Sequence, residues 1–241
     1  GFIVYSQKST TVSIGERYSI ESKILNESRE YNVYLPPSYN TSTTTKYPVL
    51  YILDGDYNFH HVTGIVEQLS SISKRIPEMI VVGISDSGHS KYIKNMTLYD
   101  KKSNPEGRFS KFLKFINMEL KPAVNGKFKT ANFEMLSGHS LGGYFVINTL
   151  LSNPNSFNAY IAISPSLWQI DYMTKDKLTS FFEKNEMLNR SLYLSLGNEE
   201  GMGVLGFVDQ FDILTFADKY YKNKPLGLDF VFKHYPEENH N

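Results

Sequence analysis

Cysteine is absent from the 241 residues, which excludes disulfides, thiolate catalysis and cysteine-ligated zinc. A charge excess is also missing, because 25 lysines and arginines balance 25 aspartates and glutamates. Without net charge or a basic block, the chain is not expected to bind nucleic acid or an anionic membrane. No apolar run reaches the ~18 residues of a membrane-spanning helix. These absences leave a globular protein whose partners are not polyanions.

The length suits one large α/β domain, and no segment has the composition of a linker, so residues 1–241 are treated as a single domain. The apolar start, Phe2 to Gln7, is typical of the end of a signal peptide or of an edge strand. A periplasmic or secreted location is slightly favoured over a cytoplasmic one. Nothing in the sequence indicates the oligomeric state.

Hydrophobic patterning predicts that strands and helices alternate. Residues 16–24 and 30–35 alternate apolar and polar side chains, as antiparallel strands do. Apolar runs typical of buried strands follow at residues 47–53, 79–84, 133–136, 158–163, 191–196 and 228–232. Helices are expected at residues 59–73, 106–120, 141–151, 175–185 and 208–221. The order predicts an α/β fold: a mostly parallel central sheet, antiparallel N-terminal strands and helices on both faces. Residues 85–106 are expected to be a polar loop at the rim of a site.

The segment Gly138-His139-Ser140-Leu141-Gly142 fits the Gly-x-Ser-x-Gly pattern of a nucleophile elbow. In that device a serine lies on a strained turn between a strand and a helix, and the flanking glycines avoid collisions of a Cβ with neighbouring backbone. The apolar run before Ser140 and the helical spacing after it supply this context. A plain Gly/Ser turn is the alternative interpretation of the same residues.

Chemistry-bearing residues follow other expected strands, and ligand sites in open α/β sheets lie beyond the carboxyl ends of the strands. Asp54-Gly55 follows one strand, Glu199-Glu200 another, and a histidine-containing tail follows the last. A serine needs a base, and the base needs a carboxylate to orient it. The chain order serine, acid, histidine is the one associated with α/β-hydrolases. His234 is the rival base, and Asp54 could be the acid, although a structural hydrogen-bonding role is favoured for it.

Several of these motifs together resemble the esterase-D-like, or putative esterase, family of α/β-hydrolases. The matching segments are Tyr51-Ile52-Leu53-Asp54-Gly55, Gly138-His139-Ser140-Leu141-Gly142-Gly143, Ser164-Pro165-Ser166-Leu167-Trp168, Gly197-Asn198-Glu199-Glu200 and Pro236-Glu237-Glu238-Asn239-His240. The Ser-Pro-Ser-Leu-Trp segment is most similar to the enterochelin (ferric siderophore) esterase branch. The chain departs from the family in stopping one residue after His240, where relatives normally continue into a further helix.

The resemblance implies Ser140 as nucleophile and His240 as general base and acid. It implies an oxyanion hole made by the backbone N–H groups of Leu141 and Asp56. The family's spacing after the strand-ending glycine selects Glu200 as the acid, with the adjacent Glu199 as the alternative.

Other side chains are expected to line the substrate pocket: Trp168, His139, Tyr57 and His60, the last together with its neighbour His61. For His139 a packing or pocket-lining role is favoured over that of base, because neighbouring side chains diverge from a sharp turn. No metal or organic cofactor is expected.

We therefore expect a serine carboxylic-ester hydrolase acting on a small ester, with a siderophore-type ester as one option. An acyltransferase that uses the same triad is one alternative, and a non-catalytic binding domain on the same fold is another. The scaffold hosts many ester chemistries, so the substrate does not follow from the fold.

Overall fold

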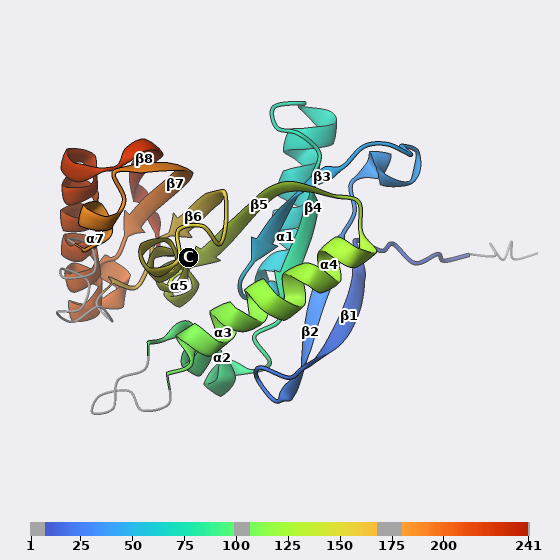
Figure 1. Cartoon of the computed structure of the whole chain (residues 1–241), viewed down its shortest axis with the longest axis horizontal. Coiled ribbons are helices and arrows are strands. Elements are labelled where there is room, and N and C mark those ends of the chain that lie inside the picture. Colours follow the sequence, from blue (N-terminus) through green and yellow to red (C-terminus); the bar gives the residue numbers. More distant parts are fainter. Residues whose placement is uncertain (1–7, 99–106, 168–179, 241) are drawn as a thin grey trace, which may run out of the picture.

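The structure is a computed structural model that describes residues 8–98, 107–167 and 180–240. Its centre is an eight-stranded sheet in the order β1-β2-β4-β3-β5-β6-β7-β8 (Figure 1). The strands are β1 (Glu16–Ser22), β2 (Glu27–Tyr34), β3 (Tyr47–Ile52), β4 (Ile80–Ile84), β5 (Thr130–His139), β6 (Ala159–Ile163), β7 (Met187–Asn198) and β8 (Leu226–Asn239). β1 and β2 form an antiparallel pair, β2 runs antiparallel to β4, and the remaining pairs are parallel. The predicted mostly parallel sheet with antiparallel N-terminal strands is confirmed.

Period-two alternation divides the core between the two faces of the sheet. On β3, Val49 and Tyr51 belong to the larger apolar cluster, whereas Leu50 and Ile52 belong to the smaller one. On β4, Val82 and Val81 are divided in the same way. Because both sides of these strands are buried, their sequences are continuously apolar rather than alternating.

Helices cover both faces of the sheet and contribute to both apolar clusters. Helix α1 (Gly55–Glu67), with the π-helical turn η2 (Gln68–Ile72), contributes Phe59 and Val66 to the smaller cluster. The larger cluster includes apolar side chains of the helices α3 (Phe109–Phe115), η3 (Ile116–Leu120), α4 (Lys121–Lys127), α5 (Leu141–Ser152) and α7 (Val204–Asn223). In Figure 1 the α3–α4 rod crosses one side of the sheet, with α1 on the other. The short helices are η1 (Pro37–Asn40), η5 (Glu200–Met202) and α2 (His89–Met96).

Two sequence expectations about helices were wrong. The stretch 85–106 was expected to be loop, but α2 occupies part of it, while residues 99–106 lie outside the described part. A helix is expected at residues 106–120, but it begins at Phe109 and continues past Leu120 as α4. Pro122 is tolerated there because it lies in the first turn of α4, directly after the π-helical turn η3, where the regular hydrogen-bond ladder is already interrupted.

Other expectations fall on residues that the structure does not describe, namely the N-terminal stretch Phe2 to Gln7 and the first five residues, 175–179, of the helix expected at 175–185. Within residues 8–98, 107–167 and 180–240, none of the helices has both the length and the apolar character needed to cross a bilayer.

Candidate active site

Ser140 lies at the sharp turn between β5 and α5. Its backbone has φ 54° and ψ −119°, a strained conformation for a residue with a side chain. Gly138 is required because a Cβ there would come within 2.4 Å of the Gly142 backbone. The N-terminus of α5 points toward the turn, and its unpaired N–H groups favour negative charge. The predicted strand-turn-helix context of the serine is confirmed.

His240 contacts Ser140 across a sequence separation of a hundred residues. Its Nε2 atom is 3.0 Å from Ser140 Oγ, and its Nδ1 atom hydrogen-bonds with the Glu199 carboxylate Oε2. The structure thus brings a hydroxyl, an imidazole and a carboxylate into one continuous chain of contacts. This arrangement can transfer the serine proton to the imidazole while the carboxylate fixes the ring orientation.

The carboxylate beside His240 belongs to Glu199, so the preference for Glu200 is corrected. Glu199 is only 1% exposed, whereas Glu200 is exposed and begins the short helix η5. β7 ends at Asn198, so Glu199 is the first residue after the strand, and the chain has already turned into η5 at Glu200. Burial acts to raise the pKa of Glu199, but hydrogen bonds from His240 and Ser164 outweigh it and leave that pKa below its usual value. Glu199 is therefore ionised beside the imidazole at neutral pH.

A register shift between β7 and β8 explains why His240 reaches the serine and His234 does not. His234 pairs with Leu196 in the ladder and is exposed. The next pairing joins Asn239 to Asn198, so four residues of β8 lie opposite one residue of β7. This one residue is Gly197, where a Cβ would come within 2.6 Å of the Asn239 carbonyl oxygen. Because of this shift, the last residues of β8 lie beside the end of β7, and His240 contacts Glu199.

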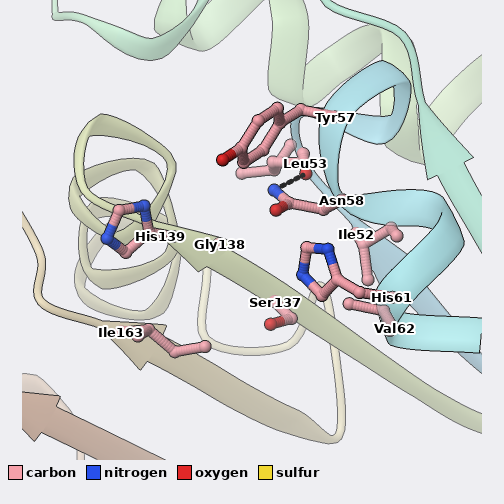
Figure 2. A pocket seen from close by; sticks show the side chains of 10 residues that line it. All are labelled: Ile52, Leu53, Tyr57, Asn58, His61, Val62, Ser137, Gly138, His139 and Ile163. Atoms are coloured by element: carbon pink, nitrogen blue, oxygen red, sulfur yellow. Dashed lines mark hydrogen bonds between the residues drawn. The ribbon is translucent and has the colours of Figure 1, made fainter. Parts of the chain in front are cut away.

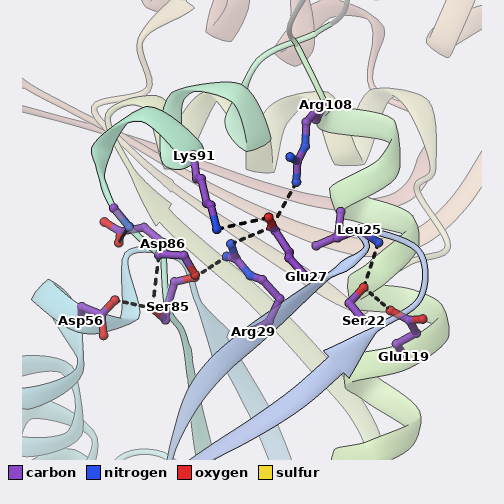
Figure 3. A network of polar contacts seen from close by, with 12 residues as sticks. Ser22, Leu25, Glu27, Arg29, Asp56, Ser85, Asp86, Lys91, Arg108 and Glu119 are labelled. Carbon is purple, nitrogen blue, oxygen red and sulfur yellow. Dashed lines mark hydrogen bonds and ion pairs between the residues drawn. The ribbon is translucent and has the colours of Figure 1, made fainter.

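The two predicted oxyanion donors begin neighbouring helices. Leu141 is the first residue of α5, and Asp56 is the second residue of α1. Because β3 and β5 are adjacent parallel strands, these helix starts lie at the same edge of the sheet. The Asp56 carboxylate accepts a hydrogen bond from Arg17 and, as Figure 3 shows, another from Ser85. The side chain of Asp56 is therefore occupied, and its backbone N–H is the group that can act as an oxyanion donor.

A cavity of about 250 Å³ lies between α1 and the ends of β3, β5 and β6 (Figure 2). From α1 come Tyr57, Asn58, His61 and Val62, while β5 contributes Ser137, Gly138 and His139. Most of its lining surface is carbon, with a few polar side chains, as ligand pockets have. Its β5 wall leads directly into the turn that carries Ser140.

The expected pocket residues have different outcomes. Tyr57 and His139 line the cavity, but His60 does not. On a helix with 3.6 residues per turn, 57, 58, 61 and 62 share one face, so His61 lines the cavity and His60 is exposed on another face. Trp168 lies outside the described residues.

His139 also contacts His240. Its Nε2–H donates to the carbonyl oxygen of His240 at 2.5 Å, and the two rings lie 4.8 Å apart. Burial lowers the pKa of His139, although the contact with the His240 carbonyl acts in the opposite direction. A neutral His139 is suited to holding the chain end in place rather than to exchanging protons with Ser140.

Sequence reasoning missed one side chain that contacts Ser140. The Ser166 hydroxyl is 3.1 Å from Ser140 Oγ, and its backbone N–H donates to the Ser140 carbonyl at 3.0 Å. The only available signal was its place in the Ser164-Pro165-Ser166 segment after β6, because a buried serine has no pattern of its own. Across the described ranges, no group of three or more histidine, aspartate or glutamate side chains could hold a metal ion.

Fold and site together define an α/β-hydrolase with a serine, histidine and glutamate at the carboxyl edge of the sheet. A sequence model of the putative esterase family matches residues 22–203, and the chain belongs to this family. The match includes Ser140 and Glu199 and ends before His240.

Two of the relatives in sequence are named as siderophore esterases. The chain is 30% identical over 185 residues to the ferri-bacillibactin esterase BesA of Bacillus subtilis, an alignment that covers 66% of this chain. It is 29% identical over 171 residues, or 64% of the chain, to the siderophore triacetylfusarinine C esterase of Aspergillus fumigatus. The alignments span 63% and 56% of the lengths of those two relatives.

A solved structure shows the same architecture. The IroE-like serine hydrolase of Shewanella oneidensis superimposes with a TM-score of 0.83 at 32% identity. The match covers 94% of this chain and 75% of the other.

Proposed function

We propose that the chain is a serine carboxylic-ester hydrolase that works through an acyl-enzyme on Ser140. The observation that carries this proposal is the chain of contacts from Ser140 Oγ through His240 to the buried Glu199 carboxylate. A serine hydroxyl is a poor nucleophile until a base removes its proton, and His240 Nε2 is within reach of that proton. The ionised Glu199 holds the ring in the required tautomer and stabilises the imidazolium that forms.

The reaction has two matching halves. Ser140 Oγ bonds to the ester carbonyl carbon, the carbonyl electrons move to its oxygen, and His240 takes the serine proton. The N–H groups of Leu141 and Asp56 bind the resulting oxyanion, and His240 returns the proton to the departing alcohol. Water then repeats the sequence on the acyl-enzyme and releases the acid. The mechanism calls for no metal or organic cofactor.

The substrate that the comparisons favour is a siderophore-type ester, because the relatives that align with this chain are named for such substrates. The cavity beside the elbow, about 250 Å³ in volume, suits an acyl group of modest size rather than a whole siderophore. The rest of a larger substrate would extend across the open carboxyl edge of the sheet.

The test compares p-nitrophenyl esters of increasing acyl length with wild type, Ser140→Ala and His240→Ala. Wild type should turn over the shorter esters, and both variants should fall to near background. His234→Ala is the matched control, since it removes an exposed histidine from the same strand and should retain activity. Equal turnover by wild type and Ser140→Ala would refute the proposal.

The same enzyme preparations would then be incubated with ferri-bacillibactin and with triacetylfusarinine C, and products followed by mass spectrometry. Ring opening or cleavage by wild type alone would support the siderophore assignment. An increase in turnover on adding an alcohol, with a new ester as product, would instead identify an acyltransferase.

A further inference from the structure

Asp54 occupies an unusual position in the turn between β3 and α1. Its backbone is left-handed, with φ 52° and ψ 45°, at the residue that precedes the first turn of α1. Aspartate at such a position commonly caps the helix with its carboxylate, but Asp54 makes no capping hydrogen bond. Its Oδ2 atom instead accepts a hydrogen bond of 2.9 Å from the hydroxyl of Tyr92 on α2. The strained turn is therefore held from outside its own helix.

The Tyr92 hydroxyl also reaches the nucleophile elbow. The backbone N–H of Gly142 acts to lower the pKa of the Tyr92 hydroxyl, against the effect of burial, and Asp54 Oδ2 lies 3.4 Å from where a Cβ on Gly142 would be. Asp54, Tyr92 and Gly142 thus form a bridge between the starts of α1 and α5. Asp56 follows Asp54 by two residues and Leu141 precedes Gly142 by one, so the bridge joins the two segments that carry the proposed oxyanion donors.

The same turn is held on its other side by the Asp56 side chain. Asp56 accepts a hydrogen bond from Arg17. It accepts another from the Ser85 hydroxyl, and Arg29 donates to the Ser85 carbonyl (Figure 3). Contacts from both sides restrict the rotation of the peptide between Gly55 and Asp56. An oxyanion hole requires this restriction, since its donors must point to one place before the negative charge appears.

We propose that Asp54 and Tyr92 are positioning residues that hold the N–H groups of Asp56 and Leu141 in register with each other. The inference rests on the proposed function, because it assigns a role within the same reaction. Neither side chain contacts the reacting atoms. They act by fixing the separation of two backbone donors, each of which is worth a factor of ~10²–10³ in kcat in other serine hydrolases.

The charge on Asp54 fits this role. Burial raises the pKa of Asp54 to about 7, although the hydrogen bond from Tyr92 acts to lower it, and the nearby Asp86 and Asp56 raise it further. A large fraction of the Asp54 carboxyl is therefore uncharged at neutral pH. An uncharged carboxyl accepts the Tyr92 hydrogen bond without adding negative charge beside the forming oxyanion.

The experiment measures kcat and KM on p-nitrophenyl butyrate for Tyr92→Phe, Asp54→Ala and Asp54→Asn. Tyr92→Phe and Asp54→Ala should lower kcat by about 10–100-fold, part of the loss of one donor, and leave KM within about twofold. Asp54→Asn keeps an oxygen to which Tyr92 can donate and should restore most of the activity. Tyr160→Phe is the control, because it also removes a buried tyrosine hydroxyl, one that donates to the carbonyls of Asn153 and Pro154.

A trifluoromethyl ketone separates positioning from general destabilisation. Ser140 adds to this inhibitor to give an oxyanion, so its inhibition constant should rise in Tyr92→Phe by the same factor as kcat/KM falls. Tyr160→Phe should lower the melting temperature without changing either constant. If Tyr92→Phe does not fold, Asp54→Ala provides the same comparison.

Unchanged kcat and inhibition constants in Tyr92→Phe and Asp54→Ala would overturn the inference and leave the proposed function standing. The same is true of losses no larger than those of Tyr160→Phe. A wild-type protein that neither turns over esters nor reacts with a fluorophosphonate would overturn the proposed function and the inference with it.

Discussion

Two carboxyl groups lie on either side of Ser140 in the order of the strands, and their surroundings shift their pKa values in opposite directions. Glu199 follows β7 and contacts His240, while Asp54 follows β3 and contacts Tyr92. Burial acts to raise both pKa values, yet that of Glu199 is below its usual value and that of Asp54 is raised to about 7. The difference lies in the partner: an imidazole can become a cation, whereas a phenol cannot. At neutral pH one edge of the sheet thus holds an ionised acid, Glu199, and a partly uncharged one, Asp54, with separate tasks.

The largest expected effect on activity comes from removing the charge of Glu199. Glu199→Gln should lower kcat by about 10³–10⁴-fold, because an amide cannot stabilise the imidazolium and favours the wrong ring tautomer. Glu200→Gln is the matched control, and it should stay within about twofold of wild type because Glu200 is exposed. Steady-state kinetics on p-nitrophenyl butyrate measure both. The assignment is wrong if Glu200→Gln is the more damaging change.

A smaller effect is expected at Ser166, whose hydroxyl lies 3.1 Å from the nucleophile. Ser166→Ala removes one neutral hydrogen-bonding group, worth roughly 1 kcal/mol, so kcat/KM should fall about fivefold. Single-turnover acylation rates would show whether the loss is in attack by Ser140. An acylation rate equal to that of wild type would mean that Ser166 has no part in orienting the nucleophile.

Raising the pH should increase the difference in kcat between wild type and Asp54→Asn. As wild type is taken from pH 6 to pH 9, Asp54 ionises with a pKa of about 7 and places a negative charge beside the oxyanion turn. The ratio of kcat in Asp54→Asn to kcat in wild type should therefore increase across this range by several-fold. Parallel pH profiles of the two proteins measure the ratio, and a constant ratio would mean that the charge of Asp54 does not reach the oxyanion.

The smallest effect is expected on stability. The pKa of Asp54 is raised from 3.8 to about 7 in the folded protein, so the folded state holds a proton that the unfolded state has released between these values. The stability associated with this proton is fully present below pH 3.8 and is lost as the pH rises through about 7. The melting temperature of Asp54→Asn minus that of wild type should therefore be larger at pH 8 than at pH 5. Equal differences at both pH values would contradict the raised pKa.

Local sequence signals were sufficient for the sheet and for the elbow. Continuous apolar runs identify strands buried on both faces, and glycines around Ser140 identify a turn with no room for a Cβ. The order of serine, acid and histidine along the chain then suggests which loops meet. These features depend on residues close together in sequence.

The remaining features depend on contacts between distant segments. The choice of Glu199 over Glu200 follows from where β7 ends, and the reach of His240 follows from the register shift opposite Gly197. The hydrogen bonds of Tyr92 and Ser166 join strands or helices far apart in the chain. Neither residue belongs to a motif whose type or spacing predicts its partner, so the sequence alone does not predict these contacts.

The most direct test of the central claim is covalent labelling of the resting protein with a fluorophosphonate, followed by peptide mass spectrometry. The account predicts a single adduct on Ser140 in wild type and in Glu200→Gln, strongly slowed labelling in Glu199→Gln, and none in Ser140→Ala. An adduct on another residue, or labelling of Ser140→Ala at the wild-type rate, would contradict it.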